Sequence, residues 1–300
     1  MVSGDKTDDY THIKDSSFIR KERYVVERTM IHQVRGHETK DGAGVKLVRV
    51  LGPQTMKLFD PILMLDAFDS TEPSDYTAGF PMHPHRGIET VSYVAQGKMM
   101  HRDSLGMSDT VESGEVQWMT AGSGILHEER LPAVDRMLGV QLWLNLPQSE
   151  KMTAPTYRAV KNADIPEIPL EGGKLRLLAG EYLAHKGAQG AHLPLDYYDI
   201  HLEAGASLRI DTAATRSVMV FTLLGEAVIA GERVAEKTAV KLSEGDVLSV
   251  AATADGPAEI LFMSSEALNE PVAWGGPIVM NREEELRQAY FELDEEIFIR

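Results

Sequence analysis

The chain has 300 residues with a hydrophobic fraction of 43%, which is enough for two ordinary domains or one large one. Its formal net charge of -16 disfavours direct binding to nucleic acid or to an anionic membrane. The sequence contains no cysteine, which excludes disulfides, thiolate metal ligands and a cysteine nucleophile. A polar, acidic N-terminus and the lack of an uncharged apolar stretch of about 18 residues predict a cytoplasmic protein without a membrane segment.

Residues 45 to 265 consist of short apolar or alternating runs separated by Gly, Pro, Asp and Ser, a pattern typical of strands and turns. The runs include VKLVRVLG, TVSYVAQG, EVQWMTAG, LGVQLWLNLP, KLRLLAG, VMVFTLLG and DVLSVAA. Many short strands favour sandwiches or barrels, because an antiparallel sheet must close or cover its edges. The sequence therefore predicts an all-β protein in which both halves have this character.

A weak internal repeat supports two packed barrels. The run TVSYVAQG ending at Gly97 resembles VMVFTLLG ending at Gly225, and Gly114-Glu-Val resembles Gly245-Asp-Val. The paired glycines are 128 and 131 residues apart, which suggests one duplicated unit with a small insertion.

The domain boundaries follow from composition. Residues 153 to 173 are rich in proline and lack periodicity, so we expect them to connect the two barrels. The expected units are an N-terminal extension packing on the barrels (1–44), a first barrel (45–160) and a second (161–300). A short helix is predicted near the C-terminus, where Asn281 resembles an N-cap. Its apolar positions are Leu286, Ala289, Tyr290 and Leu293.

Two short clusters contain candidate metal ligands. His83 and His85 are two residues apart, so on an extended strand both imidazoles point to one face. His127 and Glu129 have the same spacing, whereas Glu128 faces the opposite side. A lone His-x-His is more often a loop feature, but burying two such pairs without a cation would leave costly unpaired polar groups. We therefore predict one metal site formed by all four residues of the two pairs.

The second half of the chain lacks these ligands. The repeat offsets place Asp211, Ala213, Ala258 and Ile260 at the corresponding positions, and none of them is a histidine. We therefore expect the second barrel to bind no metal in this way. The remaining candidates are interpreted as structural: His101 to Ser104 as a hydrogen-bonded turn, and His185, His192 and His201 as ordinary polar residues.

The chain resembles the pirin family of the cupin superfamily in HPHRGIETVSYVAQG, GEVQWMTAGSGILHEER, QLWLNLPQSEKMTAPTY and, near the C-terminus, GGPIVMNREEE. The resemblance implies a bicupin, with two packed jelly-roll barrels and a short C-terminal helix. It implies metal ligands at His83, His85, His127 and Glu129. The general cupin pattern instead places its glutamate four residues after the second histidine, at Glu89. The pirin-like assignment puts Glu89 behind the ligands, where it would orient an imidazole.

Three imidazoles and a carboxylate would leave up to two open positions on a six-coordinate divalent metal. We expect one ion per chain, most simply Fe(II), with Mn, Co, Ni, Cu or Zn as alternatives. Such an ion can acidify a bound hydroxyl and hold the anion beside dioxygen. The resemblance implies ring-opening dioxygenation of an aromatic substrate, a flavonol such as quercetin, with Glu129 as a proton acceptor. It also implies an alternative, a non-enzymatic iron-dependent regulator whose protein partner is a transcription factor or a metabolic enzyme.

Overall fold

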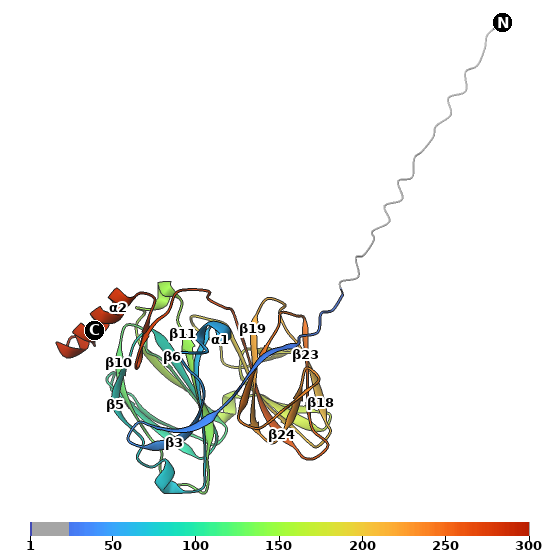
Figure 1. The fold of residues 1–300 in the computed structure, drawn as a ribbon, viewed down its shortest axis with the longest axis horizontal. Helices are drawn as coiled ribbons and strands as arrows, with labels where there is room; N and C mark the ends of the chain where they lie inside the picture. Colours follow the sequence, from blue (N-terminus) through green and yellow to red (C-terminus); the bar gives the residue numbers. More distant parts are fainter. Residues whose placement is uncertain (2–23, 300) are drawn as a thin grey trace.

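The computed structural model describes Met1 and residues 24–299, which form two β-barrels side by side (Figure 1). Residues 2–23 of the predicted N-terminal extension lie outside the described residues, as does Arg300. Within the described part, the only helix longer than one turn is α2 (Glu283–Asp294). The predicted all-β bicupin with a C-terminal helix is therefore confirmed. In this part of the chain no helix is long and apolar enough to span a membrane.

The first barrel contains a seven-stranded and a four-stranded antiparallel sheet. The larger sheet has the order β12 (Thr156–Val160), β9 (Glu115–Thr120), β6 (Ile88–Gln96), β11 (Met137–Asn145), β4 (Ile62–Ser70), β3 (Val45–Leu51) and β2 (His37–Asp41). The smaller sheet has the order β5 (Phe80–His85), β10 (Ile125–Arg130), β7 (Lys98–Asp103) and β8 (Ser108–Glu112). A single helical turn, α1 (Met56–Phe59), precedes β4.

The second barrel repeats this plan strand for strand. Its larger sheet has the order β1 (Met30–Arg35), β22 (Thr238–Leu242), β19 (Ser217–Leu224), β24 (Ala258–Ser265), β17 (Leu195–Leu202), β14 (Gly173–Ala179) and β13 (Glu167–Leu170). Its smaller sheet has the order β18 (Ser207–Asp211), β23 (Val247–Ala252), β20 (Ala227–Ile229) and β21 (Glu232–Val234). Two short hairpins lie outside these sheets: β15 (Glu181–Tyr182) with β16 (His185–Lys186), and β25 (Ala273–Gly275) with β26 (Ile278–Met280).

Of the two glycine pairs from which the internal repeat was inferred, one occupies equivalent positions in the two barrels and the other does not. Gly97 and Gly225 follow the equivalent strands β6 and β19. Gly114 precedes β9, however, whereas Gly245 precedes β23, which is the counterpart of β10. A glycine followed by an acidic residue and valine simply occurs at two different turns. The inward-facing counterparts of the two ligand pairs therefore lie in β18 and β23, at Leu208, Ile210, Leu248 and Val250, and not at the positions given by the offsets.

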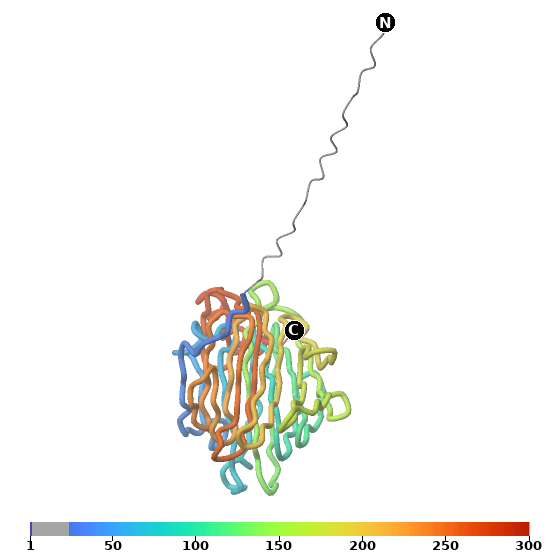
Figure 2. Tube along the Cα trace, turned by 90° about the vertical axis from the view of Figure 1, so that its right-hand side faces the viewer, coloured from blue at the N-terminus to red at the C-terminus, as the bar shows by residue number. Residues whose placement is uncertain are grey.

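The two seven-stranded sheets pack face to face, and we call the space between them the seam. In Figure 2 the second barrel lies in front of the first, with its strands upright. Large buried side chains from both sheets fill the seam, among them Val91, Tyr93, Trp118, Tyr197, Phe221 and Leu261. Because strand residues alternate between faces, the same sheets present their other side chains to the barrel interiors. The interior of the second barrel is aliphatic and aromatic, with Ile200, Val220 and Phe262 at its centre.

Each end of the chain contributes to the barrel that is formed mainly by the other half of the sequence. Strand β1 pairs with β22 of the second barrel, whereas β2 pairs with β3 of the first. At the other end, α2 packs against the first barrel, where Glu292 forms a buried ion pair with Arg86, Nη1 to Oε2 2.8 Å. The helix begins one residue later than predicted, since Arg282 and not Asn281 is the N-cap, and Glu285 closes a capping box.

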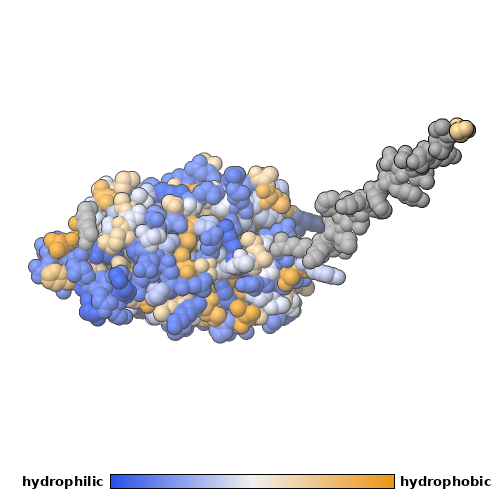
Figure 3. Space-filling model, turned by 90° about the horizontal axis from the view of Figure 1, so that it is seen from above, coloured by the Kyte–Doolittle hydropathy of each residue, from blue (hydrophilic) through white to orange (hydrophobic). Residues whose placement is uncertain are grey.

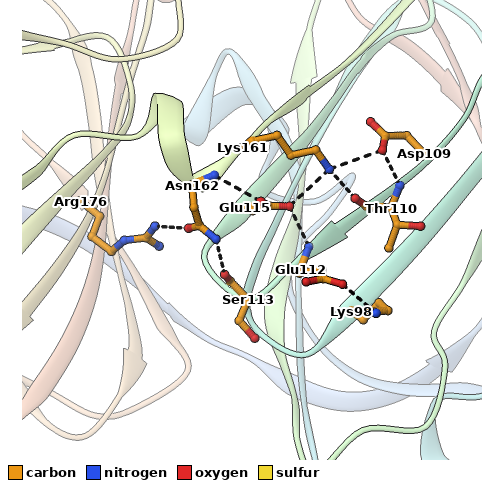
Figure 4. Close-up of polar contacts among 9 residues, drawn as sticks. All are labelled: Lys98, Asp109, Thr110, Glu112, Ser113, Glu115, Lys161, Asn162 and Arg176. Atoms are coloured by element: carbon orange, nitrogen blue, oxygen red, sulfur yellow. Dashed lines mark hydrogen bonds and ion pairs between the residues drawn. The ribbon is translucent and has the colours of Figure 1, made fainter.

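The segment between the barrels is held by polar contacts (Figure 4). Lys161 lies 3.4 Å from carboxylate oxygens of both Asp109 and Glu115 in the first barrel. Asn162 donates to the Ser113 carbonyl at 3.0 Å and accepts from Arg176 of the second barrel at 2.7 Å. The connection is therefore an ordered part of the seam. On the face of the molecule in Figure 3, hydrophobic residues lie scattered among hydrophilic ones.

Candidate metal centre

The two candidate ligand pairs lie on adjacent antiparallel strands of the small sheet. β10 pairs with β5 so that His127 stands opposite His83. Along β10, His127 and Glu129 are buried inside the barrel, as the alternation of an extended strand requires. Glu128 points the other way and forms an ion pair with Arg102 at 2.9 Å.

Three imidazole nitrogens converge at one point. The Nε2 atom of His83 lies 3.0 Å from that of His85 and 3.0 Å from that of His127. His85 and His127 are buried, and His83 is partly exposed. These three residues form a group whose ligand atoms all lie within 4.8 Å of one another. The strands therefore bring together all three histidines selected from the sequence.

The other ring nitrogens show how a cation would relieve these close approaches. Nδ1 of His83 lies 2.9 Å from the Pro81 carbonyl, and Nδ1 of His85 lies 3.1 Å from the Pro277 carbonyl. A carbonyl oxygen only accepts, so in both rings the proton is on Nδ1. In the neutral rings both Nε2 atoms then present lone pairs to each other at 3.0 Å. A metal ion between them removes this repulsion.

A third ring is oriented by a relay that sequence analysis missed. Nδ1 of His127 lies 3.4 Å from Nδ1 of His101, whose Nε2 donates to Asp103 Oδ2 at 2.8 Å. Asp103 also accepts from the backbone N–H groups of Leu105 and Met107. His101 was expected in a turn, with contact to a substrate at the rim as the lesser alternative, but β7 pairs with β10 and places its ring against His127 inside the barrel. Tyr157 stacks on His101 with a centroid separation of 4.1 Å.

The centre fits a divalent transition metal. Burial, followed by the charge of His83, lowers the pKa of His85 to about 3, and burial lowers the pKa of His127 well below its usual value. Both rings are therefore neutral at pH 7 and available as ligands. A metal bound to imidazole nitrogen at about 2.1 Å with right-angled ligands separates those nitrogens by about 3 Å, and the Nε2 distances at His83 match this. Carbonyl and carboxylate partners behind the rings are the usual support of metal-bound histidines.

Glu129 lies close to this centre but outside the group of three. Its Oε1 accepts from Gln117 Nε2 at 2.6 Å, and its Oε2 accepts from Gln141 Nε2 at 3.0 Å. The register of β10 against β5 shifts between His127 and Glu129, which displaces the second residue of the pair. To become a fourth ligand, Glu129 would exchange one of these amide hydrogen bonds for the metal.

Glu89 requires a correction. The strand alternation of β6 places it on the same face as Val91 and Tyr93, which pack in the seam between the barrels. Its Oε1 accepts from Thr120 Oγ1 at 2.6 Å. The imidazoles have other partners, so Glu89 does not orient one of them. Even spacing from the histidines was misleading because β6 belongs to the other sheet.

A cavity of about 580 Å³ opens onto His83 and His85. Its apolar wall is formed by Met64, Phe80, Trp143 and Trp274, and Gln141 contributes a polar group. Trp143 meets the His85 ring edge to face, with centroids 5.0 Å apart. Trp274 and Pro277 come from the C-terminal hairpin, so the end of the chain completes both the cavity and the histidine support. Sequence analysis missed these two residues, because their contacts join segments over 100 residues apart.

Comparison with known proteins agrees with the fold. Residues 44–144 match the Pirin family model, and residues 197–299 match that of the Pirin C-terminal cupin domain. A pirin-like protein of Caulobacter vibrioides is 39% identical over 268 residues, covering 88% of this chain and 96% of the relative. The chain belongs to the pirin family.

Two further comparisons span similar lengths. Human pirin is 36% identical over 265 residues, which cover 86% of this chain and 90% of the human protein. The crystal structure of quercetin 2,3-dioxygenase from Acinetobacter baumannii is 33% identical, with a TM-score of 0.84 and coverage of 91% of this chain and 98% of that one. The resemblance seen in the sequence motifs therefore extends over both barrels.

Proposed function

We propose that this pirin is a metal-dependent dioxygenase that oxygenates a flavonol such as quercetin with opening of a ring. The observation that carries the proposal is the apolar, tryptophan-walled cavity that opens directly onto two of the three converging imidazoles. Its volume of about 580 Å³ lies within the range of small-molecule sites. The similarity to a bacterial quercetin 2,3-dioxygenase supports the same substrate class.

The cavity walls would orient a flat aromatic substrate. Trp143 and Trp274 lie with ring centroids 5.9 Å apart and an interplanar angle of 36°, so together they offer a broad aromatic surface. Aromatic rings pack well against such surfaces in offset or edge-to-face arrangements. Because Trp143 also contacts His85, a substrate resting on this wall would present its edge to the imidazole nitrogens.

Glu129 is the proposed fourth ligand and proton acceptor. Its carboxylate is buried and held by Gln117 and Gln141, and Gln141 also lines the cavity. A buried carboxylate within reach of a substrate hydroxyl can accept its proton, which is general base catalysis. The two glutamines would fix the carboxylate orientation before the substrate arrives.

The proposed cofactor is one divalent metal at His83, His85 and His127, most simply Fe(II), although Mn, Co, Ni, Cu or Zn would also suit imidazole ligands. Such a metal would supply Lewis acidity that favours the deprotonated substrate hydroxyl and an open position for dioxygen. Metal analysis of protein purified without added metal would identify the ion.

Oxygen consumption tests the proposal. Purified protein is loaded with each metal in turn, and an oxygen electrode records uptake on addition of quercetin. We expect uptake with at least one metal and its loss in His83→Ala, while the exposed control His185→Ala behaves like wild type. If no metal form consumes oxygen with quercetin, the dioxygenase proposal fails. The non-enzymatic regulator with a protein partner would then become the better account of the same centre.

A further inference from the structure

A second cluster of potential ligands lies at the seam, on the outer face of the second barrel. Asp199 and His201 are on β17, and Glu259 stands directly opposite His201 on β24. Their ligand atoms lie within 4.8 Å of one another. Strand alternation places all three on the face that packs against the first barrel, alongside Tyr197 and Leu261. They are therefore separate from the barrel interior, where the three-histidine centre has aliphatic counterparts.

The cluster is connected to the first barrel through one carboxylate oxygen. Tyr93 Oη donates to Asp199 Oδ2 at 2.6 Å, and Arg176 Nη1 donates to Tyr93 Oη at 3.0 Å. His201 Nε2 lies 2.8 Å from the same Asp199 oxygen. Nδ1 of His201 lies 4.0 Å from Glu259 Oε2. Arg176 is the residue seen in Figure 4 at the end of the connection between the barrels.

The remaining carboxylate oxygens have no donor among the described residues. Asp199 Oδ1 and Glu259 Oε1 are both buried and without a hydrogen-bond partner. The Asp199 side chain is 0% exposed and that of Glu259 11% exposed, so both oxygens are shielded from bulk solvent. A buried carboxylate oxygen without a partner is strongly unfavourable.

The basic side chains nearby are already engaged with other groups. Lys237 and Arg136 both form ion pairs with Asp69, at 2.8 Å. Arg176 donates to Tyr93, to the Gly114 carbonyl and to Asn162. In the part of the chain that the structure describes, His201 is the only basic residue paired with Asp199 or Glu259. Burial, followed by the charge of Asp199, raises the pKa of the Glu259 carboxyl.

We propose that Asp199, His201 and Glu259 bind a second divalent cation, which joins β17 to β24 at the seam. Two carboxylates and one imidazole suit Zn²⁺, a metal of intermediate softness, or the harder Mn²⁺, better than Ca²⁺, which prefers oxygen ligands alone. The ion would lie among the three clustered ligand atoms, with His201 donating a nitrogen in place of its hydrogen bond to Asp199. Entry is from solvent past His201, whose side chain is 36% exposed. The chain would then hold two metals of different character, against the sequence-based expectation of one.

Metal stoichiometry tests this proposal with the intact chain. Wild type, His83→Ala/His127→Ala and Asp199→Asn/Glu259→Gln are each equilibrated with Zn²⁺, dialysed and assayed by elemental analysis. We expect two ions in wild type and one in each double variant. Glu203→Gln, an exposed acidic residue just after β17, is the matched control and should retain two. Circular dichroism verifies folding, and His201→Ala, at the exposed edge, should lose the second ion without disturbing buried packing.

The outcomes separate this proposal from the dioxygenase proposal. A wild-type stoichiometry of one that Asp199→Asn/Glu259→Gln does not lower would overturn it and leave a cluster neutralised by protons alone. Retention of two ions in folded Asp199→Asn/Glu259→Gln or in His201→Ala would also overturn it, because the second ion would then lie elsewhere. Oxygen uptake with quercetin should be unchanged in Asp199→Asn/Glu259→Gln. The seam site can therefore fail while the dioxygenase proposal stands, and the reverse also holds.

Discussion

The two barrels share one strand order but have opposite interiors. In the first, the paired strands β5 and β10 point His83, His85 and His127 inward. In the second, the equivalent strands β18 and β23 pair Leu208 with Val250 and Ile210 with Leu248. The aliphatic set stabilises its barrel by burial alone, at about 1.5–3 kcal/mol for each large side chain. The imidazole set is arranged to hold a cation and has a layer of supporting acceptors.

This contrast shows that, with the same strand order, a barrel interior lined by imidazoles depends on additional groups that orient the rings. The acceptor for His83 is the Pro81 carbonyl on its own strand, but the supports of the other two rings come from outside the two ligand strands: the Pro277 carbonyl from the C-terminal hairpin, and His101 with Asp103 from β7. Without them the ring tautomers would not be fixed, and the lone pairs would not all face one point. The second barrel has no such requirement, because aliphatic side chains need only shape complementarity.

The largest effect is expected from removing a ligand. His83→Ala or His127→Ala should abolish retention of the metal at this centre while the protein stays folded, because both hydrophobic cores are untouched. Elemental analysis measures the metal content per chain, and circular dichroism measures whether the protein is folded. The exposed variant His185→Ala is the control. Global unfolding of His83→Ala would mean that the ion is structural, and it would remove the functional distinction between the barrels.

Breaking the contact between α2 and the first barrel should also have a large effect, on the free energy of unfolding. Glu292→Ala leaves the buried Arg86 without its carboxylate, and breaking one partner of a buried ion pair typically destabilises by about 3–5 kcal/mol. Glu284→Ala on the exposed face of α2 should change the free energy of unfolding by less than about 0.5 kcal/mol. Urea unfolding monitored by fluorescence compares the two. Equal, small effects would show that the helix is not needed to close the first barrel.

A smaller but sharper effect distinguishes the adjacent residues Glu129 and Glu128. Glu129→Ala should reduce metal affinity or dioxygenase activity by at least the ~10–100-fold seen for partners of metal ligands. Glu128→Ala should change little, because its carboxylate faces outward to Arg102. Isothermal titration with the metal and oxygen uptake provide the measurements.

Glu89→Ala is a second comparison for the same experiment. Its carboxylate lies in the seam, so metal affinity should remain at the wild-type level. Loss of the metal in Glu89→Ala, with retention in Glu129→Ala, would establish the general cupin arrangement in place of the pirin one. Damage from Glu128→Ala would contradict the extended geometry of β10.

The smallest predicted effect on the centre concerns the relay. Asp103→Asn weakens the acceptor that fixes the His101 tautomer, which in turn orients His127. We expect a loss in metal affinity near the lower end of the ~10–100-fold range. Asp109→Asn, on the neighbouring strand β8, is the control. Titration with the metal should show no change for this control, and an unaltered affinity in Asp103→Asn would exclude the relay as a support.

Local periodicity predicted the features that depend on one strand at a time. The spacing of His83 from His85 and the opposite faces of Glu128 and Glu129 follow from the twofold alternation of extended backbone. The position of His101 beside His127 could not be predicted, because it depends on which strands pair, and no local pattern encodes the pairing of β7 with β10. For the same reason, Glu89 was expected behind the imidazoles, although its strand belongs to the other sheet.

The crossed ends of the chain have a consequence for the order of events during synthesis. The carbonyl that fixes the His85 tautomer belongs to Pro277, 192 residues downstream. The carbonyl of Phe298, still later in the chain, accepts a hydrogen bond from Arg86. On the ribosome, the first barrel can collapse early, since domains generally fold from the N-terminal end first. Its ligand rings acquire their final orientation only after the last segment of the chain has emerged and docked. The proposed metal loading would therefore follow translation.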